Sequence, residues 1–223
     1  MKSDDCGNCA SLSNSHFCNL KQKYLNFLNE NKKHVTYRKG ETIFREGDSP
    51  QGLYCIDNGI IRLNHIDEEG NEVILRFHKA GEMLGYRALF AEEKYHATAV
   101  AQENSEVCFI PKNIVKELMA KEPDLALSIL KQVSKEIHST EDRMTSIISK
   151  PVKSRVAEAL IYFKNELPES KWTRKDIAEW IGTTPETVMR TLAHFESEGF
   201  IHQEGRLIRI ADDQAISNIS KEY

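Results

Sequence analysis

The chain has 223 residues and a formal net charge of −4, and 40% of its residues are hydrophobic, so it can bury one large core or two modest ones. We expect neither a membrane span nor a secretory signal peptide, because no apolar run approaches the roughly 18 residues of a span and the residues after Met1 are polar. The net charge argues against a broad nucleic-acid-binding surface but allows a local one. We therefore expect a cytoplasmic protein, where clustered cysteines bind metal more often than they form disulfides.

The first 20 residues form a polar arm that carries three of the five cysteines, in the stretch CGNCASLSNSHFC. Cys6, Cys9 and Cys18 follow the spacing C-x2-C-x8-C, which by itself is a weak metal motif and suits zinc as well as other metals. His16 lies close to Cys18, but an exposed position in the arm is favoured for it over metal ligation.

Residues 21–120 are expected to form a β-rich domain after one short helix. An amphipathic helix is predicted over residues 20–34, where Leu20, Tyr24, Phe27 and Leu28 recur at helical spacing. From about 35 to 110, short β-type runs alternate with turns, and glycines recur at intervals near ten residues, as in an antiparallel barrel or jelly roll. The DEEGNE segment predicts a hairpin turn between strands Ile60–Ile66 and Val73–Phe77. Cys55 follows a tyrosine on a predicted strand and is interpreted as a small buried filler.

A long helix is predicted over residues 121–150, and Pro151 ends it. An apolar seam runs along it with spacings of 3, 4, 3, 4 and 3 residues: Leu130, Val133, Ile137, Thr140, Met144 and Ile147. The seam could pack on the β-rich domain of its own chain. A dimer interface is favoured because the opposite face of the helix is highly charged.

Residues 151–223 have the layout of a winged helix-turn-helix, after one amphipathic helix at 152–167. Thr173 can cap the first helix of the motif, and Gly182 permits the tight turn that follows it. Pro185 suits the first turn of the second helix, and the segment FIHQEGRLIRI predicts a two-stranded wing. Three packed helices that bind no DNA are the alternative, and the order of these signals argues against it.

The second helix of the motif is predicted to read DNA with its N-terminal half. Arg190 can bind guanine O6 and N7 with two hydrogen bonds, and Glu186 can accept one from cytosine N4. Met189 also faces outward, while Thr183, Thr184, Thr187 and Arg206 are expected to contact phosphates. Because residues 151–223 carry ten Lys and Arg against twelve Asp and Glu, binding must depend on a local patch and on two half-sites.

Together, these features resemble the CRP/FNR family of bacterial transcription regulators. The stretches GEMLGYRALF (81–90) and IAEWIGTTPETVMRTLAHFESEGFI (177–201) carry the resemblance most specifically. It implies an α+β fold with an N-terminal cyclic-nucleotide-binding-like β-roll (jelly roll), a long dimerisation helix and a C-terminal winged helix-turn-helix. It also implies a homodimer that binds palindromic double-stranded DNA and contacts RNA polymerase. Glu186 and Arg190 fall on the family's base-reading positions, and Met189 replaces the serine usual in FNR proteins.

The resemblance bears on the signal as well. The family's cyclic-AMP binders hold the nucleotide through a glutamate and an Arg-Ser/Thr pair, where this chain has Tyr86, Tyr95 and His96. A phosphate buried in the β-roll would lack its counter-charge, so no cyclic AMP is expected. Gly81, Glu82 and Gly85 nevertheless keep the backbone framework of the family's nucleotide site.

The resemblance to FNR-type sensors implies a [4Fe–4S] cluster held by Cys6, Cys9, Cys18 and Cys108, although the second gap in the arm is longer than in the best-known FNR type. On its strand, Cys108 is expected to face away from the core side of Val107 and Phe109. The same thiols could instead hold zinc or act as a disulfide switch, and the cysteines could be unused in a haem- or ligand-sensing relative. The chain has no Gly-rich phosphate loop and no nucleophile elbow, so an enzyme is not expected. The hypothesis is an oxygen-, nitric oxide- or redox-responsive regulator.

Overall fold

The computed structural model describes residues 6, 9–167, 172–205 and 207–223. The chain divides into two compact units, Met1–Lys135 and Glu136–Tyr223, and each is described here by itself. The boundary between the two units lies inside the long helix α4 (Pro123–Ser149).

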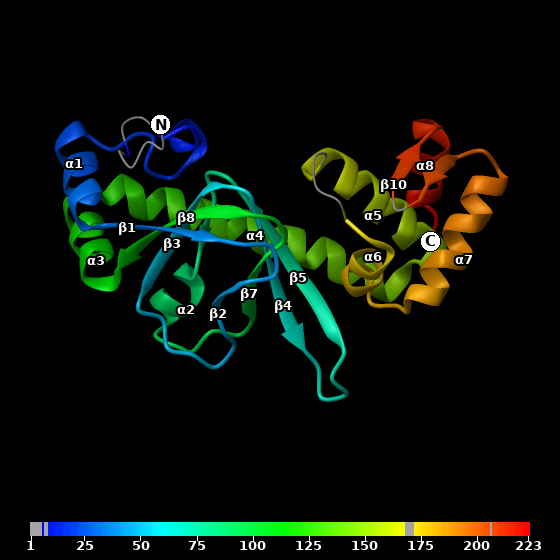
Figure 1. Cartoon of the computed structure of the whole chain (residues 1–223), viewed down its shortest axis with the longest axis horizontal. Helices are drawn as coiled ribbons and strands as arrows, with labels where there is room; N and C mark the ends of the chain where they lie inside the picture. Colours follow the sequence, from blue (N-terminus) through cyan, green and yellow to red (C-terminus); the bar gives the residue numbers. More distant parts are fainter. Residues whose placement is uncertain (1–5, 7–8, 168–171, 206) are drawn as a thin grey trace. The chain divides into compact units, whose positions relative to one another are not determined.

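The first unit is built on a β-roll of two four-stranded sheets, in the orders β1-β8-β3-β6 and β2-β7-β4-β5 (Figure 1). The strands are β1 (Lys33–Tyr37), β2 (Thr42–Phe44), β3 (Gly52–Asn58), β4 (Ile60–Ile66), β5 (Glu72–Lys79), β6 (Met83–Leu84), β7 (Thr98–Ala101) and β8 (Ser105–Pro111). Alternating residues of both sheets, among them Ile56, Ile61 and Val107, fill the space between them. The predicted β-rich domain is therefore confirmed.

The hairpin between β4 and β5 confirms the turn predicted at 67–72. The Asp67 carboxylate accepts hydrogen bonds from the backbone N–H groups of Glu69 and Asn71, at 3.0 and 2.7 Å. Gly70 has φ +84°, a conformation that glycine adopts without strain. Helix α2 (Tyr86–Ala91) was not anticipated within this domain, because six residues are too few to show a helical period.

The outer face of the sheet that contains β3 and β8 is covered by the arm, by α1 (Gln22–Asn31) and α3 (Lys112–Lys121), and by the start of α4 (Pro123–Ser149). Phe17 of the arm and Leu28 of α1 are buried there in one apolar cluster with Leu53 of β3. The predicted helix at 20–34 is shorter than expected, because residues 33–37 pair with β8 as a strand.

Helix α4 ends at Ser149, and α5 (Val152–Glu166) begins after Pro151, as the proline predicted. Four apolar residues of the predicted seam are exposed in the single chain, Leu130, Ile137, Met144 and Ile147, and Val133 is half-buried. An exposed apolar stripe of this length marks an interaction surface more often than a solvated face. No helix in the described part of the chain is long and apolar enough to cross a membrane.

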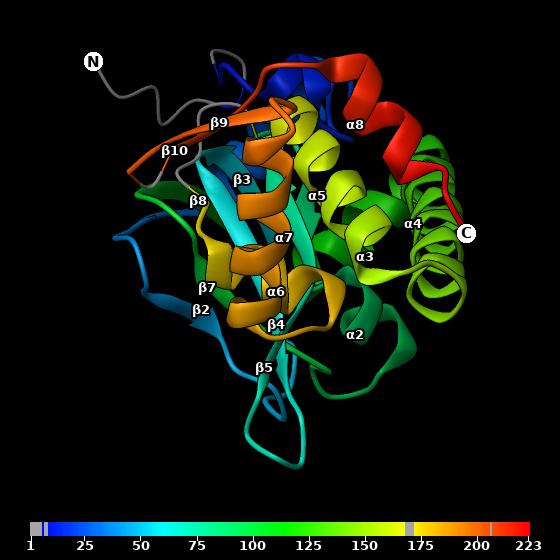
Figure 2. The same cartoon turned by 90° about the vertical axis from the view of Figure 1, so that its right-hand side faces the viewer.

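The second unit contains the end of α4 and the predicted winged helix-turn-helix (Figure 2). After α5, its elements are α6 (Arg174–Ile181), α7 (Pro185–Ser197), β9 (Ile201–Glu204), β10 (Leu207–Ile210) and α8 (Asp213–Ser220). Its core is formed by Phe163 of α5, Ile177 of α6 and Phe195 of α7, all fully buried. Helix α8, which the sequence did not lead us to expect, buries Ile216 and packs on α5.

A capping box begins α6, as the sequence predicted for Thr173. The Asp176 N–H donates to the Thr173 hydroxyl at 3.1 Å, and the Asp176 carboxylate accepts from the Thr173 N–H at 2.7 Å. Gly182 ends the helix with φ +67°, which makes the sharp turn into α7 possible.

Replacing Thr173 by alanine is expected to lower the free energy of unfolding by about 1 kcal/mol, because the N–H of Asp176 loses its acceptor. Urea denaturation of the full chain, followed by tryptophan fluorescence, measures the change. Thr173→Ser keeps the hydroxyl and is the matched control. Equal stability of Thr173→Ala and the parent protein would show that the capping box contributes nothing.

Candidate DNA-reading helix and thiol cavity

Helix α7 presents one buried and one exposed face, as the sequence predicted. Val188, Leu192 and Phe195 have no exposed surface, and they fix the rotation of the helix about its axis. Glu186, Met189 and Arg190 are exposed near its N-terminus, with Met189 47% exposed. An apolar side chain this exposed on a recognition helix can contact a thymine methyl group.

Two of the three threonines predicted to contact phosphates form hydrogen bonds at the start of α7. The Thr184 hydroxyl caps the helix and accepts from the Thr187 N–H at 3.3 Å. The Arg190 guanidinium donates to the Thr187 hydroxyl, also at 3.3 Å. Thr187 therefore holds the Arg190 side chain along the N-terminal end of the helix. Arg206, the other predicted phosphate contact, lies outside the described residues.

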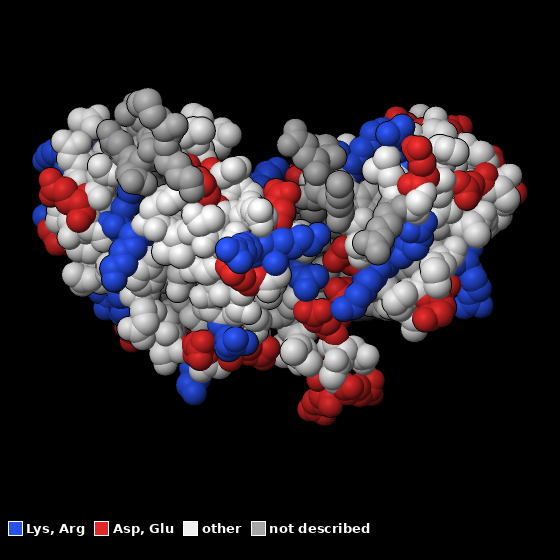
Figure 3. Space-filling model, viewed as in Figure 1, with Lys and Arg blue, Asp and Glu red and all other residues white. Residues whose placement is uncertain are grey.

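The wing is the antiparallel pair β9 and β10, and α6 anchors it. The Arg174 guanidinium donates to the Gln203 side chain at 2.6 Å and to the Gly205 carbonyl at 3.3 Å. Acidic and basic side chains are intermingled on the face of this unit visible in Figure 3, in line with the balanced charge of the sequence.

The first unit contains a cavity between the arm and the outer face of the sheet, which we call the thiol cavity. Four cysteines line it: Cys6, Cys9, Cys55 and Cys108. Cys55 on β3 lies directly opposite Cys108 on the antiparallel neighbour β8. Val107 packs in the roll interior and Phe109 contacts Tyr54, so the predicted outward orientation of Cys108 is confirmed.

The arm reaches the cavity by local turns. The Cys9 N–H donates to the Cys6 carbonyl at 3.3 Å, and the Cys6 N–H donates to the Asn29 side chain of α1 at 3.1 Å. Both cysteines of the C-x2-C pair line the cavity, as a shared ligand site requires.

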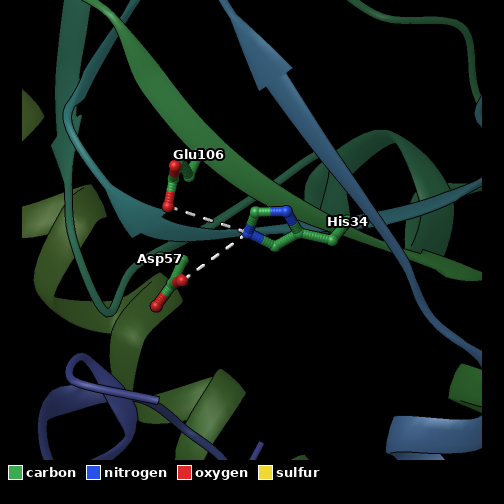
Figure 4. A group of neighbouring side chains, drawn as sticks. All are labelled: His34, Asp57 and Glu106. Atoms are coloured by element: carbon green, nitrogen blue, oxygen red, sulfur yellow. Dashed lines mark ion pairs between the residues drawn. The ribbon is translucent and has the colours of Figure 1, made fainter. Parts of the chain in front are cut away.

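A polar cluster from three strands adjoins the thiol cavity (Figure 4). The His34 Nε2 atom of β1 is 3.6 Å from a carboxylate oxygen of Asp57 and 3.9 Å from one of Glu106. The other oxygen of Asp57 accepts a hydrogen bond from the Cys9 thiol at 2.8 Å. Asp57 therefore joins the arm to the sheet, a contact that the sequence gave no means of predicting.

The electrostatics of the thiol cavity favour neutral thiols. Burial raises the pKa of Cys108 to about 11, and burial together with the hydrogen bond to Asp57 raises the pKa of Cys9. The pKa of Cys55 is also raised, first by burial and then by the nearby thiols. A metal centre that binds here must displace these protons. Burial opposes the charge of Lys32, but its pKa is raised overall by Cys108, Cys6 and Cys9, so the cavity has a cation beside it.

The donor set of the thiol cavity fits a thiophilic metal centre. Four thiols around one space match the four ligands of a tetrahedral zinc ion or of a [4Fe–4S] cluster. The volume of the cavity is about 40 Å³. The side chain of Lys32 offsets part of the negative charge that four thiolates carry.

Cys18 lies apart from this set. Its side chain is exposed, and it is absent from the residues that line the thiol cavity. Its neighbour Phe17 is 5% exposed and packs in the apolar cluster on the sheet. The structure thus brings together three of the four predicted ligands and adds Cys55, which the sequence analysis interpreted as a filler.

The arm also contacts the beginning of helix α4. Phe17 shares the apolar cluster with Leu125 and Ile129 of α4. The imidazole of His16 forms a hydrogen bond of 3.1 Å with the Ser128 hydroxyl, and the residue is half-buried, so the exposed position expected for it is wrong. The thiol cavity and the first turns of α4 are therefore joined through one short segment of the arm.

Tyr86 and Tyr95, which stand in place of the nucleotide-holding residues that the resemblance implies, lie close to Gly85. Tyr86 and Tyr95 are buried, and the Tyr95 ring stacks on Phe44 with 3.8 Å between ring centroids. A Cβ atom at Gly85 would lie 3.4 Å from the Tyr95 hydroxyl. The side chain of Tyr95 therefore fills the space beside Gly85.

Comparison with known proteins agrees with both units. Residues 34–122 match the family model of the cyclic nucleotide-binding domain, and residues 154–219 match the Crp-like helix-turn-helix domain. Electron transport regulator A of Shewanella oneidensis is 33% identical over 81% of this chain and 75% of its own length. The chain belongs to the CRP/FNR family of transcription regulators.

Other members of this family resemble the chain over nearly its full length. The fumarate and nitrate reduction regulatory protein of Shigella dysenteriae is 31% identical over 99% of this chain and 93% of its own. A solved structure of a crp/fnr family regulator from Eubacterium rectale matches with a TM-score of 0.77 and 20% identity, over 92% of this chain and 97% of that one. The likeness to that structure confirms the predicted α+β fold. This CRP/FNR protein is thus a DNA-binding regulator and not an enzyme.

Proposed function

We propose that this CRP/FNR regulator is a cytoplasmic homodimer that binds palindromic DNA under the control of a [4Fe–4S] cluster in the thiol cavity. The observation that carries the proposal is the convergence of Cys6 and Cys9 of the arm with Cys108 of β8 on one cavity. When bound, a [4Fe–4S] cluster supplies a centre that reacts with oxygen, nitric oxide or other oxidants. Cys18 is the fourth ligand that the sequence suggests.

The arm residues convert occupancy of the thiol cavity into a change at α4. Thiolates of Cys6 and Cys108 that share one centre hold the arm against the sheet. Phe17 then stays in the apolar cluster that also contains Leu125 and Ile129, which keeps the first turns of α4 in place. Without that shared centre, the arm is held by weaker contacts, such as the hydrogen bond between the Cys9 thiol and Asp57. The two states therefore differ in how firmly α4 is positioned.

Helix α4 is the element that would pair in the dimer. The exposed seam of Leu130, Ile137, Met144 and Ile147 recurs at the heptad spacing of a two-stranded coiled coil. A symmetric pair presents two α7 helices to adjacent turns of the major groove. In this arrangement Arg190 and Glu186 read bases, while Thr184, Thr187 and Arg206 approach phosphates. Contact with RNA polymerase is part of the proposal, by analogy with the family.

Purification without oxygen tests the proposed function directly. The expected product is brown and contains about four irons and four sulfides per chain. Exposure to air should bleach it and weaken its binding to DNA. A colourless protein without iron whose DNA binding does not respond to air would refute the proposal. Zinc in place of iron would identify the alternative metal that the same thiols can hold.

Replacing Arg190 by alanine is expected to remove discrimination at one guanine of each half-site, at a cost of about 1–3 kcal/mol. Arg190→Lys keeps the charge but loses the two-pronged hydrogen bond, so it should lose discrimination almost as fully. Competition binding with operator variants measures the effect, and Arg45→Ala in the first unit is the control. A uniform loss of affinity for all sequences, rescued by lysine, would show instead that Arg190 contacts phosphate.

A further inference from the structure

We propose that Cys55, and not Cys18, completes the ligand set of the thiol cavity, so that two ligands come from the sheet and two from the arm. This inference rests on the proposed function, because it concerns the residues that hold the same metal centre. It differs from the expectation drawn from the sequence, in which all three arm cysteines were ligands and Cys55 was a filler.

The register of the sheet places Cys55 beside Cys108. The two residues are direct partners on the antiparallel strands β3 and β8, and both line the thiol cavity. Cβ atoms of such partners are about 4.5–5.5 Å apart and point to the same face. On β3, Asp57 shares this face with Cys55, and it accepts the hydrogen bond from the Cys9 thiol. The face of the sheet that carries Cys55 is thus the one on which the arm lies.

The arm turns Cys18 away from this site. Ser15 and Phe17 still line the thiol cavity, but Cys18, the next residue, is exposed. Phe17 is packed against the sheet together with Leu25 and Leu28 of α1. Directing Cys18 into the cavity would require Phe17 to leave this apolar cluster, which its burial opposes. Cys55 needs no such rearrangement.

The proposed set also explains the spacing of the arm. With Cys55 as a ligand, only the C-x2-C pair of the arm must reach the metal centre. The eight residues between Cys9 and Cys18 then serve another purpose, which is to bring Phe17 onto the apolar cluster and His16 to Ser128 of α4. Cys18 remains a free thiol at the surface.

Alkylation of the full-length protein, loaded with iron under anaerobic conditions, tests the assignment without any mutation. Iodoacetamide treatment followed by peptide mass spectrometry reports which thiols react. Cys18 is expected to be labelled rapidly, while Cys6, Cys9, Cys55 and Cys108 are protected until the iron is removed by a chelator. Protection of Cys18 together with labelling of Cys55 would overturn the assignment.

Two variants give an independent reading. Cys55→Ala is expected to lower iron and sulfide from about four per chain to less than one, and Cys18→Ala is expected to leave both unchanged. Loss of iron in Cys18→Ala would overturn the assignment, as would full loading of Cys55→Ala. The failure of the proposed function is distinct, since the parent protein would then hold no iron at all. Zinc in the parent protein with Cys55 protected would support this ligand set and refute the cluster.

Discussion

Replacing Cys108 by alanine is expected to abolish iron binding, from about four irons per chain to less than one. Both the set completed by Cys18 and the set completed by Cys55 contain Cys108, so the result tests the proposed function itself. Cys108 is buried on the central strand β8, opposite Cys55, and the cavity offers no other thiol at its place. Iron and sulfide assays on anaerobically purified protein, with the visible absorbance spectrum, measure the change.

The same variant is expected to weaken dimerisation and DNA binding, because the arm loses its attachment to the sheet. The matched control is Val107→Ala, which removes a buried side chain from the same strand on the opposite face. It should lower stability by about 2 kcal/mol while the iron content stays unchanged. If Cys108→Ala kept its full iron content, β8 would supply no ligand and the proposed tether would be wrong.

Replacing Ile137 by glutamate is expected to convert the active dimer into a monomer and to reduce affinity for a palindromic operator at least a hundredfold. In a symmetric dimer each substitution removes about 1.5–3 kcal/mol of stabilisation from apolar burial. It also brings the two glutamate charges, one from each chain, together at the seam. Ile137 is 54% exposed in the single chain, so its replacement leaves the fold of the chain intact. Sedimentation velocity and operator titration at several protein concentrations measure the two effects.

Lys131→Glu changes a charge on the same helix, outside the seam, and serves as the control. It should stay dimeric and bind the operator with an affinity close to that of the parent protein. Should Ile137→Glu remain dimeric, the dimer interface would lie elsewhere than on the α4 seam.

The winged helix-turn-helix could be predicted almost residue by residue, because its signals are local. Thr173 caps a helix with Asp176 three residues away, and Gly182 takes the conformation that a tight turn requires. The spacing of Val188, Leu192 and Phe195 determines which face of α7 is left for DNA. Helix α8 could not be predicted with the same ease, since its eight residues follow the wing without a strong start signal other than Asp212.

The thiol cavity shows the opposite case. The sequence by itself determined that cysteines cluster in the arm and that Cys108 lies on a late strand. It also determined that Cys108 faces outward, because the alternation of side chains along a strand is a local rule. The register between β3 and β8, set by pairing across about fifty residues, decides that Cys55 stands beside Cys108.

Likewise, the burial of Phe17 in the apolar cluster that contains Leu28 leaves its neighbour Cys18 exposed. Proximity along the chain made Cys18 the natural partner of Cys6 and Cys9. In the structure it is Cys55, far away in the sequence, that lines the thiol cavity with Cys6 and Cys9, while Phe17 is buried and Cys18 is exposed. Burying an aromatic ring stabilises the fold more than the position of one surface thiol does.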